Sequence, residues 1–118
     1  MKIKGIKTGT LRGEIIEYSP TEKIEPVVKE LVPSLAPAGE VWWAENVNPI
    51  ELDIIHGKPL TRGYAGNTYI ATVSFHVRPM RNDRLYRGIP KKMKITFKDI
   101  LDKNGLPDLE VVKYEDIQ

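Results

Sequence analysis

The most regular pattern in the chain is an alternation of apolar and other residues over positions 68–77. Tyr69, Ala71, Val73, Phe75 and Val77 are apolar, and most of the residues between them are polar. A period of two places these apolar side chains on one face of an extended chain. The pattern predicts a strand with one buried face.

A second alternation, at residues 93–97, runs into a turn sequence. Residues 102–105 read Asp-Lys-Asn-Gly, which is typical of a tight turn. The run predicts a hairpin whose second strand covers 109–114. Weaker strand patterns lie at 2–7, 10–18, 40–47 and 50–55, and Asn48-Pro49 separates the last two.

Apolar residues at helical spacing follow a capping sequence. Residues 19–22 read Ser-Pro-Thr-Glu, which suits an N-cap, a proline at the first helical position and a capping glutamate. Ile24, Val27, Val28 and Leu31 then share one helical face. Because Pro26 lacks a backbone N–H, we expect the regular helix to begin near residue 25, after a looser turn over 20–24. Pro33 and Pro37 should end it.

Together these patterns predict an α+β fold, mainly antiparallel β, with about six to seven short strands and one short capped helix. The strands would form a small barrel, or a sheet with the helix on one face. The 118 residues fit one domain, 1–118. The absence of cysteine excludes disulfides, zinc–thiolate sites and a cysteine nucleophile.

The amino-terminal residues give an expectation about location. Residues 1–7 carry lysines but no apolar segment follows them, so they do not resemble a secretory signal. No run approaches the roughly 18 apolar residues of a membrane-spanning helix. We therefore expect a cytoplasmic protein with no membrane partner.

The net charge of +2 conceals a strongly basic centre. Residues 58–98 hold ten basic side chains and one acidic side chain, whereas residues 1–57 and 99–118 are both net acidic. A basic segment of this strength predicts a surface for nucleic acid, provided that folding keeps its charges together.

Four arginines recur at every third residue within this centre: Arg78, Arg81, Arg84 and Arg87. In a polyproline-II conformation they would line one edge at intervals of roughly 9 Å. A second basic loop, residues 56–67, precedes the 68–77 strand. Since a ten-residue strand is about 33 Å long, the two basic segments should emerge at opposite ends of it.

The leading hypothesis is a small non-enzymatic protein that binds DNA or RNA through residues 58–98. Arginine and lysine would contact phosphates, and tyrosine rings would stack on unpaired bases. The predicted contact residues are Lys58, Arg62, Tyr64, Arg78, Arg81, Arg84, Tyr86, Arg87, Lys91 and Lys92. The competing explanation is a solvated face, neutralised in part by cross-strand pairs of Lys98 with Glu110 and Lys92 with Asp116.

The alternative is an interaction or assembly protein that forms a homo-oligomer or binds a protein partner. Trp42 and Trp43 lie on opposite faces if their segment is a strand, so one of them can face outward. We take Trp42 as the predicted partner-binding residue. The acidic ends of one copy would also complement the basic centre of another.

Enzymatic activity is the third possibility, and strand parity argues against it. Glu51 and Asp53 would share a strand face that His56 does not, which predicts no metal site. The Cα atoms of Ser74 and His76 would lie nearly 7 Å apart along a strand, too far for easy hydrogen bonding. We therefore predict no catalytic residues and no cofactor.

Overall fold

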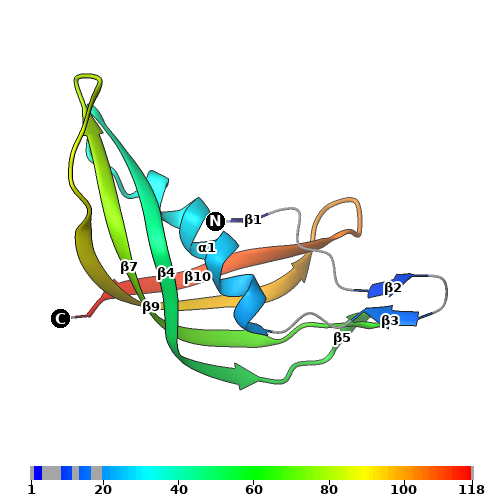
Figure 1. Cartoon of the computed structure of the whole chain (residues 1–118). Coiled ribbons are helices and arrows are strands. Elements are labelled where there is room, and N and C mark those ends of the chain that lie inside the picture. Colours follow the sequence, from blue (N-terminus) through cyan, green and yellow to red (C-terminus); the bar gives the residue numbers. More distant parts are fainter. Residues whose placement is uncertain (1, 4–8, 12–13, 17–19, 118) are drawn as a thin grey trace.

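The computed structural model describes residues 2–3, 9–11, 14–16 and 20–117 (Figure 1). Most of these residues form antiparallel strands, and one helix lies against them, which confirms the predicted α+β class with a sheet. The elements are β1 (Lys2–Ile3), β2 (Gly9–Leu11), β3 (Glu14–Ile16), α1 (Pro20–Ser34), β4 (Glu40–Ile55), β5 (Pro59–Thr61), β6 (Tyr64–Ala65), β7 (Thr68–Arg81), β8 (Arg84–Leu85), β9 (Ile89–Leu101) and β10 (Pro107–Asp116).

The main sheet has the strand order β1-β10-β9-β7-β4, and the short strand β8 pairs with the end of β7. Strands β2 and β3 form one separate pair, and β5 and β6 form another. The long strands bend, so that the sheet curves around α1 (Figure 1). We call the face toward α1 the inner face and the opposite face the outer face.

The core lies between α1 and the inner face of the sheet. The alternation predicted for β7 is confirmed, because Tyr69, Ala71, Val73, Phe75 and Val77 are each at most 3% exposed. The predicted helical face is confirmed as well. The buried apolar residues that α1, β9 and β10 add are Ile24, Val27, Val28, Leu31, Val32, Met93, Ile95, Phe97, Leu109 and Val111.

The helix is regular from its first residues, so the predicted looser turn over 20–24 is wrong. Pro26 lies inside α1, where it removes one hydrogen bond at a cost of about 3 kcal/mol. Burial of each large apolar side chain contributes roughly 1.5–3 kcal/mol, and the helix buries five of them. Packing therefore outweighs the local cost of the proline. The predicted cap residue Ser19 lies outside the described residues.

Two predicted strand pairs have different boundaries in the structure. Residues 40–47 and 50–55 form one strand, β4, because register shifts at Glu45/Asn48 and Pro49/Glu51 absorb the irregular segment. The predicted strand at 10–18 corresponds instead to the pair β2 and β3. Of the predicted strand at 2–7, the described part is β1.

The carboxy-terminal hairpin of β9 and β10 is confirmed. Asp102 accepts hydrogen bonds from the backbone N–H groups of Asn104 and Leu106, and Gly105 has a φ of +76°. The predicted pair of Lys98 with Glu110 is present in the register. A register shift between Val111 and Lys113 then sets Asp116 opposite Met93, so the predicted pairing with Lys92 is wrong.

The arginine segment is a hairpin, so the predicted polyproline-II run is wrong. Arg78 and Arg81 belong to β7, and Arg84 belongs to β8. Between the two strands, Asn82 and Asp83 have positive φ values of 49° and 62°. Two successive positive φ values are typical of a two-residue type I′ turn.

The described part of the chain contains no helix that is both long enough and apolar enough to cross a membrane.

Candidate binding surface

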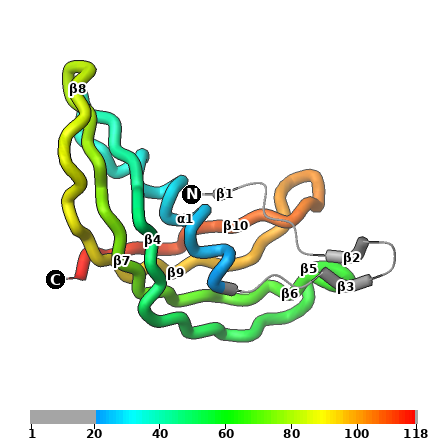
Figure 2. Tube along the Cα trace, viewed as in Figure 1, coloured from blue at the N-terminus to red at the C-terminus, as the bar shows by residue number. Residues whose placement is uncertain are grey.

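The sheet extends at one end into a narrow arm (Figures 1 and 2). We define the arm as residues 40–43 of β4 together with residues 78–90, and the body as the other described residues. Strand β8 lies at the tip of the arm (Figure 2). The molecule measures 49 × 28 × 22 Å along its principal axes.

The outer face of the arm is largely apolar. Val41, Met80 and Leu85 are partners across three neighbouring strands, so they form one continuous row. Trp43 follows on the same face, opposite Arg78. Val41, Trp43 and Leu85 are each 43–44% exposed. We call Val41, Trp43, Met80 and Leu85 the arm patch.

The four arginines do not form one edge. Arg78 lies on the outer face, where its Nη1 is 3.4 Å from Glu45 Oε1 and its Nε donates to the carbonyl of Tyr86 at 3.3 Å. Arg81 has the opposite parity and lies on the inner face. Because Arg78 and Arg81 are three residues apart on one strand, they lie on opposite faces of the sheet.

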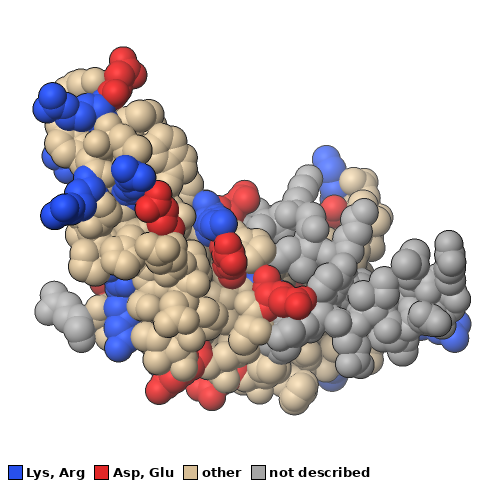
Figure 3. Space-filling model, in the orientation of Figure 1, with Lys and Arg blue, Asp and Glu red and all other residues tan. Residues whose placement is uncertain are grey.

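Arg81 is engaged by neighbouring side chains. Its Nε donates to Glu40 Oε1 at 2.7 Å, and its guanidinium lies 5.1 Å from the centre of the Tyr86 ring. The hydrogen bond from Arg81 holds the pKa of Glu40 below its usual range. Arg84 and Arg87 form no ion pair with any other described residue. Figure 3 shows Lys and Arg side chains along the arm, both at its tip and below it.

The two tryptophans alternate as expected, but the outward one is Trp43. Trp42 faces inward and packs against the core, its Nε1 donates to Glu40 at 3.3 Å, and the Lys91 ammonium lies 5.5 Å from its ring centre. The parity of β4 thus turns Trp42, the predicted partner-binding residue, toward the helix, and its part in partner binding stays a prediction.

A pocket of about 390 Å³ opens on the inner face where the arm meets the body. Its apolar wall includes Val32 and Leu35 of the helix segment and Phe75, Val77 and Met93 of the sheet. Trp42, Tyr114, Lys91 and Asp116 also line it. We call it the base pocket. It combines an apolar interior with one cation, Lys91, and two anions, Glu115 and Asp116.

The outer face of the body differs from that of the arm. Lys92, Lys94 and Lys98 alternate along β9, and acidic residues stand among them on β4 and β10. Lys94 faces Glu115, for example, and Lys98 faces Glu110. Parity separates Lys91, on the inner face, from Lys92, on the outer face.

The second basic loop lies at the opposite end of β7, as expected from the length of that strand (Figure 1). It contains the exposed side chains of Lys58 and Arg62. Tyr64 of the same loop is 4% exposed, and its hydroxyl donates to the Asp108 carbonyl at 2.9 Å. The Tyr64 ring is not available for stacking on a base, because it is buried in the core at this end of β7.

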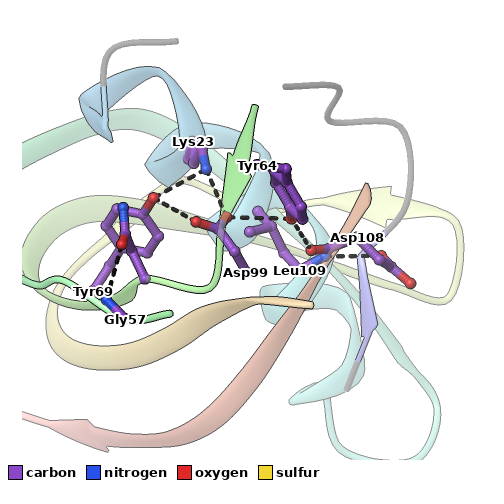
Figure 4. Close-up of polar contacts among 8 residues, drawn as sticks. Lys23, Gly57, Tyr64, Tyr69, Asp99, Asp108 and Leu109 are labelled. Atoms are coloured by element: carbon purple, nitrogen blue, oxygen red, sulfur yellow. Dashed lines mark hydrogen bonds and ion pairs between the residues drawn. The ribbon is translucent and has the colours of Figure 1, made fainter. Parts of the chain in front are cut away.

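A buried polar cluster lies at this end of the core (Figure 4). Lys23 Nζ is 2.6 Å from Asp99 Oδ1 and 3.0 Å from the Tyr69 hydroxyl. The Tyr69 hydroxyl donates to Asp99 Oδ2 at 2.7 Å, and the Tyr64 hydroxyl lies 3.4 Å from Asp99 Oδ1. The ion pair is thus enclosed and hydrogen-bonded from four elements.

The environment of this cluster favours a structural role. Burial, followed by the neighbouring Asp99 carboxylate, raises the pKa of both Tyr64 and Tyr69 well above the usual range. Both hydroxyls therefore stay protonated at neutral pH and cannot serve as bases. Asp108 is fully buried and accepts from the Leu109 N–H at 2.9 Å, while its Oδ2 has no partner among the described residues.

The acidic, serine and histidine side chains considered as catalytic candidates do not lie together in the structure. Glu51 and Asp53 are exposed on the outer face of β4. Ser74 Oγ pairs with the Asn48 carbonyl and His76 Nδ1 with the Asn46 amide, both at 3.4 Å. Within the described ranges, no group of three or more His, Asp or Glu side chains is arranged to hold a metal ion.

The arm patch itself was missed by sequence reasoning. Met80 and Leu85 stand among the arginines, and Val41 directly precedes the two tryptophans. The signal that would have found the patch is the Asn82-Asp83 dipeptide, because a two-residue turn there pairs Met80 with Leu85.

The chain matches no family model, no curated protein and no solved structure.

Proposed function

We propose that this protein is a non-enzymatic interaction module that binds a protein partner through the arm patch. The observation that carries this proposal is the continuous row of Val41, Met80 and Leu85, with the exposed Trp43 beside it. Contiguous exposed apolar side chains on a small protein commonly mark an interaction site.

The composition of the arm supports a protein partner. Interface cores are enriched in aromatic residues, methionine and arginine and depleted in lysine and acids. The outer face of the arm carries Trp43, Met80 and Arg78, whereas the outer face of β9 in the body carries lysines. Trp43 and Arg78 are also the residue types that dominate binding energy at such surfaces.

Nucleic acid is the second candidate ligand, and the lysine row of β9 favours it. Lys92, Lys94 and Lys98 point to one face, and Arg84 and Arg87 are exposed on the arm. Acidic partners beside these lysines and the ion pairs of Arg78 and Arg81 reduce the net attraction for phosphate. We therefore place this function second.

A photo-crosslinking residue at position 43 tests the proposal in cells, with position 53 as the matched control on the body. We expect protein adducts from position 43 that are absent from position 53. The purified partner should then bind the unmodified protein, and Met80→Asp should weaken that binding about tenfold or more. Adducts to nucleic acid alone, or equal adducts from both positions, would contradict the proposal.

A further inference from the structure

Strand β4 lies at the border of the main sheet (Figure 1), and within the described residues it pairs with β7 alone. Border strands of natural sheets are commonly protected by lysines, prolines or bulges. In β4 both register shifts and Pro49 lie between residues 45 and 51, and the strand contains no lysine. Residues 40–45, which we call the arm edge, therefore have none of these protections.

The backbone groups of Trp42 and Ala44 point to this free edge. The Pro79 carbonyl accepts from the N–H of Tyr86 at 2.9 Å, so the backbone of Pro79 is directed away from β4. Opposite residues of an antiparallel pair either exchange both backbone hydrogen bonds or exchange none. Trp42, opposite Pro79, is therefore directed away from β7, and Ala44 has the same parity. In the described part of the chain, neither residue has a backbone hydrogen bond outside the sheet ladder.

We propose that the partner of the arm patch binds as an extended segment, which adds an antiparallel strand to the arm edge. This inference rests on the proposed function, because it names the form in which that partner binds. Backbone hydrogen bonds to Trp42 and Ala44 attach the segment. Its side chains alternate between the two faces of the sheet, so every second one lies on the outer face, beside Val41, Trp43 and Glu45.

The outer-face side chains of the arm edge determine which segment fits. Val41 and Trp43 are exposed, and β-branched or aromatic residues opposite them form favourable cross-strand pairs. Glu45 lies on the same face, and its contact with Arg78 is long, at 3.4 Å. A basic residue opposite Glu45 adds a second cation to this carboxylate. In the antiparallel direction the segment therefore reads, from its amino end, basic, any, apolar, any, apolar.

A second copy of this chain fits the arm edge less well. Residues 40–55 include acidic side chains and no lysine or arginine. A contact between two β4 strands therefore offers Glu45 no cation. Charge thus favours a partner whose sequence differs from that of β4.

The test uses two synthetic peptides, Thr-Lys-Thr-Val-Thr-Val-Thr and the same peptide with glutamate in place of lysine. We expect the lysine peptide to bind the wild type about fivefold more tightly in an NMR titration. Glu45→Lys should reverse this preference, because it reverses the charge opposite the variable residue. Glu30→Lys, at an exposed acid of α1, changes the net charge equally and should keep the wild-type preference.

Amide hydrogen exchange of the wild type identifies the edge that receives the peptide. The bound lysine peptide should slow exchange at Trp42 and Ala44 about tenfold, and much less at Val41 and Trp43, whose N–H groups already face β7. Ala44→Pro removes one free N–H at a position where an edge strand tolerates proline, and it should weaken peptide binding about tenfold.

Three peptide results would overturn the strand addition: no binding of either peptide, equal binding of both, or slowed exchange that spares Trp42 and Ala44. A dimer in light scattering that Ala44→Pro dissociates would identify a second copy as the occupant instead. Crosslinking from position 43 tests the arm patch separately, so each of these results leaves the proposed function standing. Loss of the crosslinks alone would contradict the proposed function.

Discussion

The body and the arm are built from the same strands, yet their outer faces carry different side chains. In the body, β9 presents Lys92, Lys94 and Lys98 to the outside, with acids opposite some of them. In the arm, β4 and β7 present Val41, Trp43 and Met80 on that same face. A sheet needs only one apolar face to pack against a helix, and the inner face already supplies it.

This difference separates the residues that fold the protein from those available for binding. Val41, Trp43 and Leu85 of the arm patch remain exposed, so they contribute little to the core. The polar cluster around Lys23 has the opposite character, because it is buried and hydrogen-bonded on several sides. Substitutions in the body should therefore change stability, and substitutions in the arm should change binding.

The largest effect is expected from Lys23→Met. Removing the ammonium leaves the Asp99 carboxylate buried without a counterion, which typically costs about 3–5 kcal/mol. Urea denaturation measures this as a lower free energy of unfolding. The control is Lys29→Met on the same helix, whose partner Glu25 is exposed, so that the loss should stay below about 0.5 kcal/mol. Equal decreases in the free energy of unfolding of the two variants would show that the buried ion pair stabilises the fold no more than the exposed one.

The second effect is a loss of stability in alkaline solution. The folded state raises the pKa of Tyr64 and Tyr69, so above pH 10 the unfolded chain loses protons that the folded chain retains. The free energy of unfolding should then fall by up to about 1.4 kcal/mol per pH unit for each tyrosine. Tyrosinate absorbance and denaturation above pH 10 measure it. Tyr69→Phe should reduce this dependence by about half, and an unchanged dependence would refute the assignment.

The sequence predicts those features of the body and the arm that depend on residues close together in the chain. It does not predict those that depend on residues far apart. The buried face of β7 and the apolar face of α1 follow from periods of two and 3.6 residues, because each needs only near neighbours. The sequence does not predict that the helix continues through Pro26, because the cost of this proline is local, whereas the burial that offsets it involves strands distant in sequence. The buried pair was not predicted, because Lys23 and Asp99 are 76 residues apart.

The candidate site depended on smaller details of the backbone. The arginine spacing predicts one continuous edge, but a two-residue turn at Asn82 and Asp83 folds that segment back on itself. Similarly, a register shift after Val111 moves Asp116 from the predicted position opposite Lys92 to the inner face, where it lines the base pocket. Such one-residue shifts exchange the two faces of a strand, and alternation patterns do not reveal them.

The smallest effect is expected in the arm, from Glu40→Gln. The hydrogen bond between Arg81 and Glu40 joins β7 to β4 in the arm, and both side chains are partly accessible to solvent. Its removal should leave global unfolding unchanged within error, because exposed ion pairs contribute little. It should instead increase local opening, measured as faster amide hydrogen exchange in residues 78–85 at neutral pH.

The pH dependence of that exchange identifies the carboxylate as its cause. Since the pKa of Glu40 is lowered by Arg81, the contact is present at neutral pH and is lost as the pH falls through the folded-state value, below the usual range for glutamate. Amide protection of residues 78–85 in the wild type should therefore decrease in acid relative to Glu40→Gln, whose local opening lacks this titration. Asp53→Asn, an exposed acid of the same strand in the body, should retain the wild-type response. If Glu40→Gln exchanged like the wild type at every pH, the ion pair would have no part in ordering the arm, and its strand pairing alone would hold the arm patch in position.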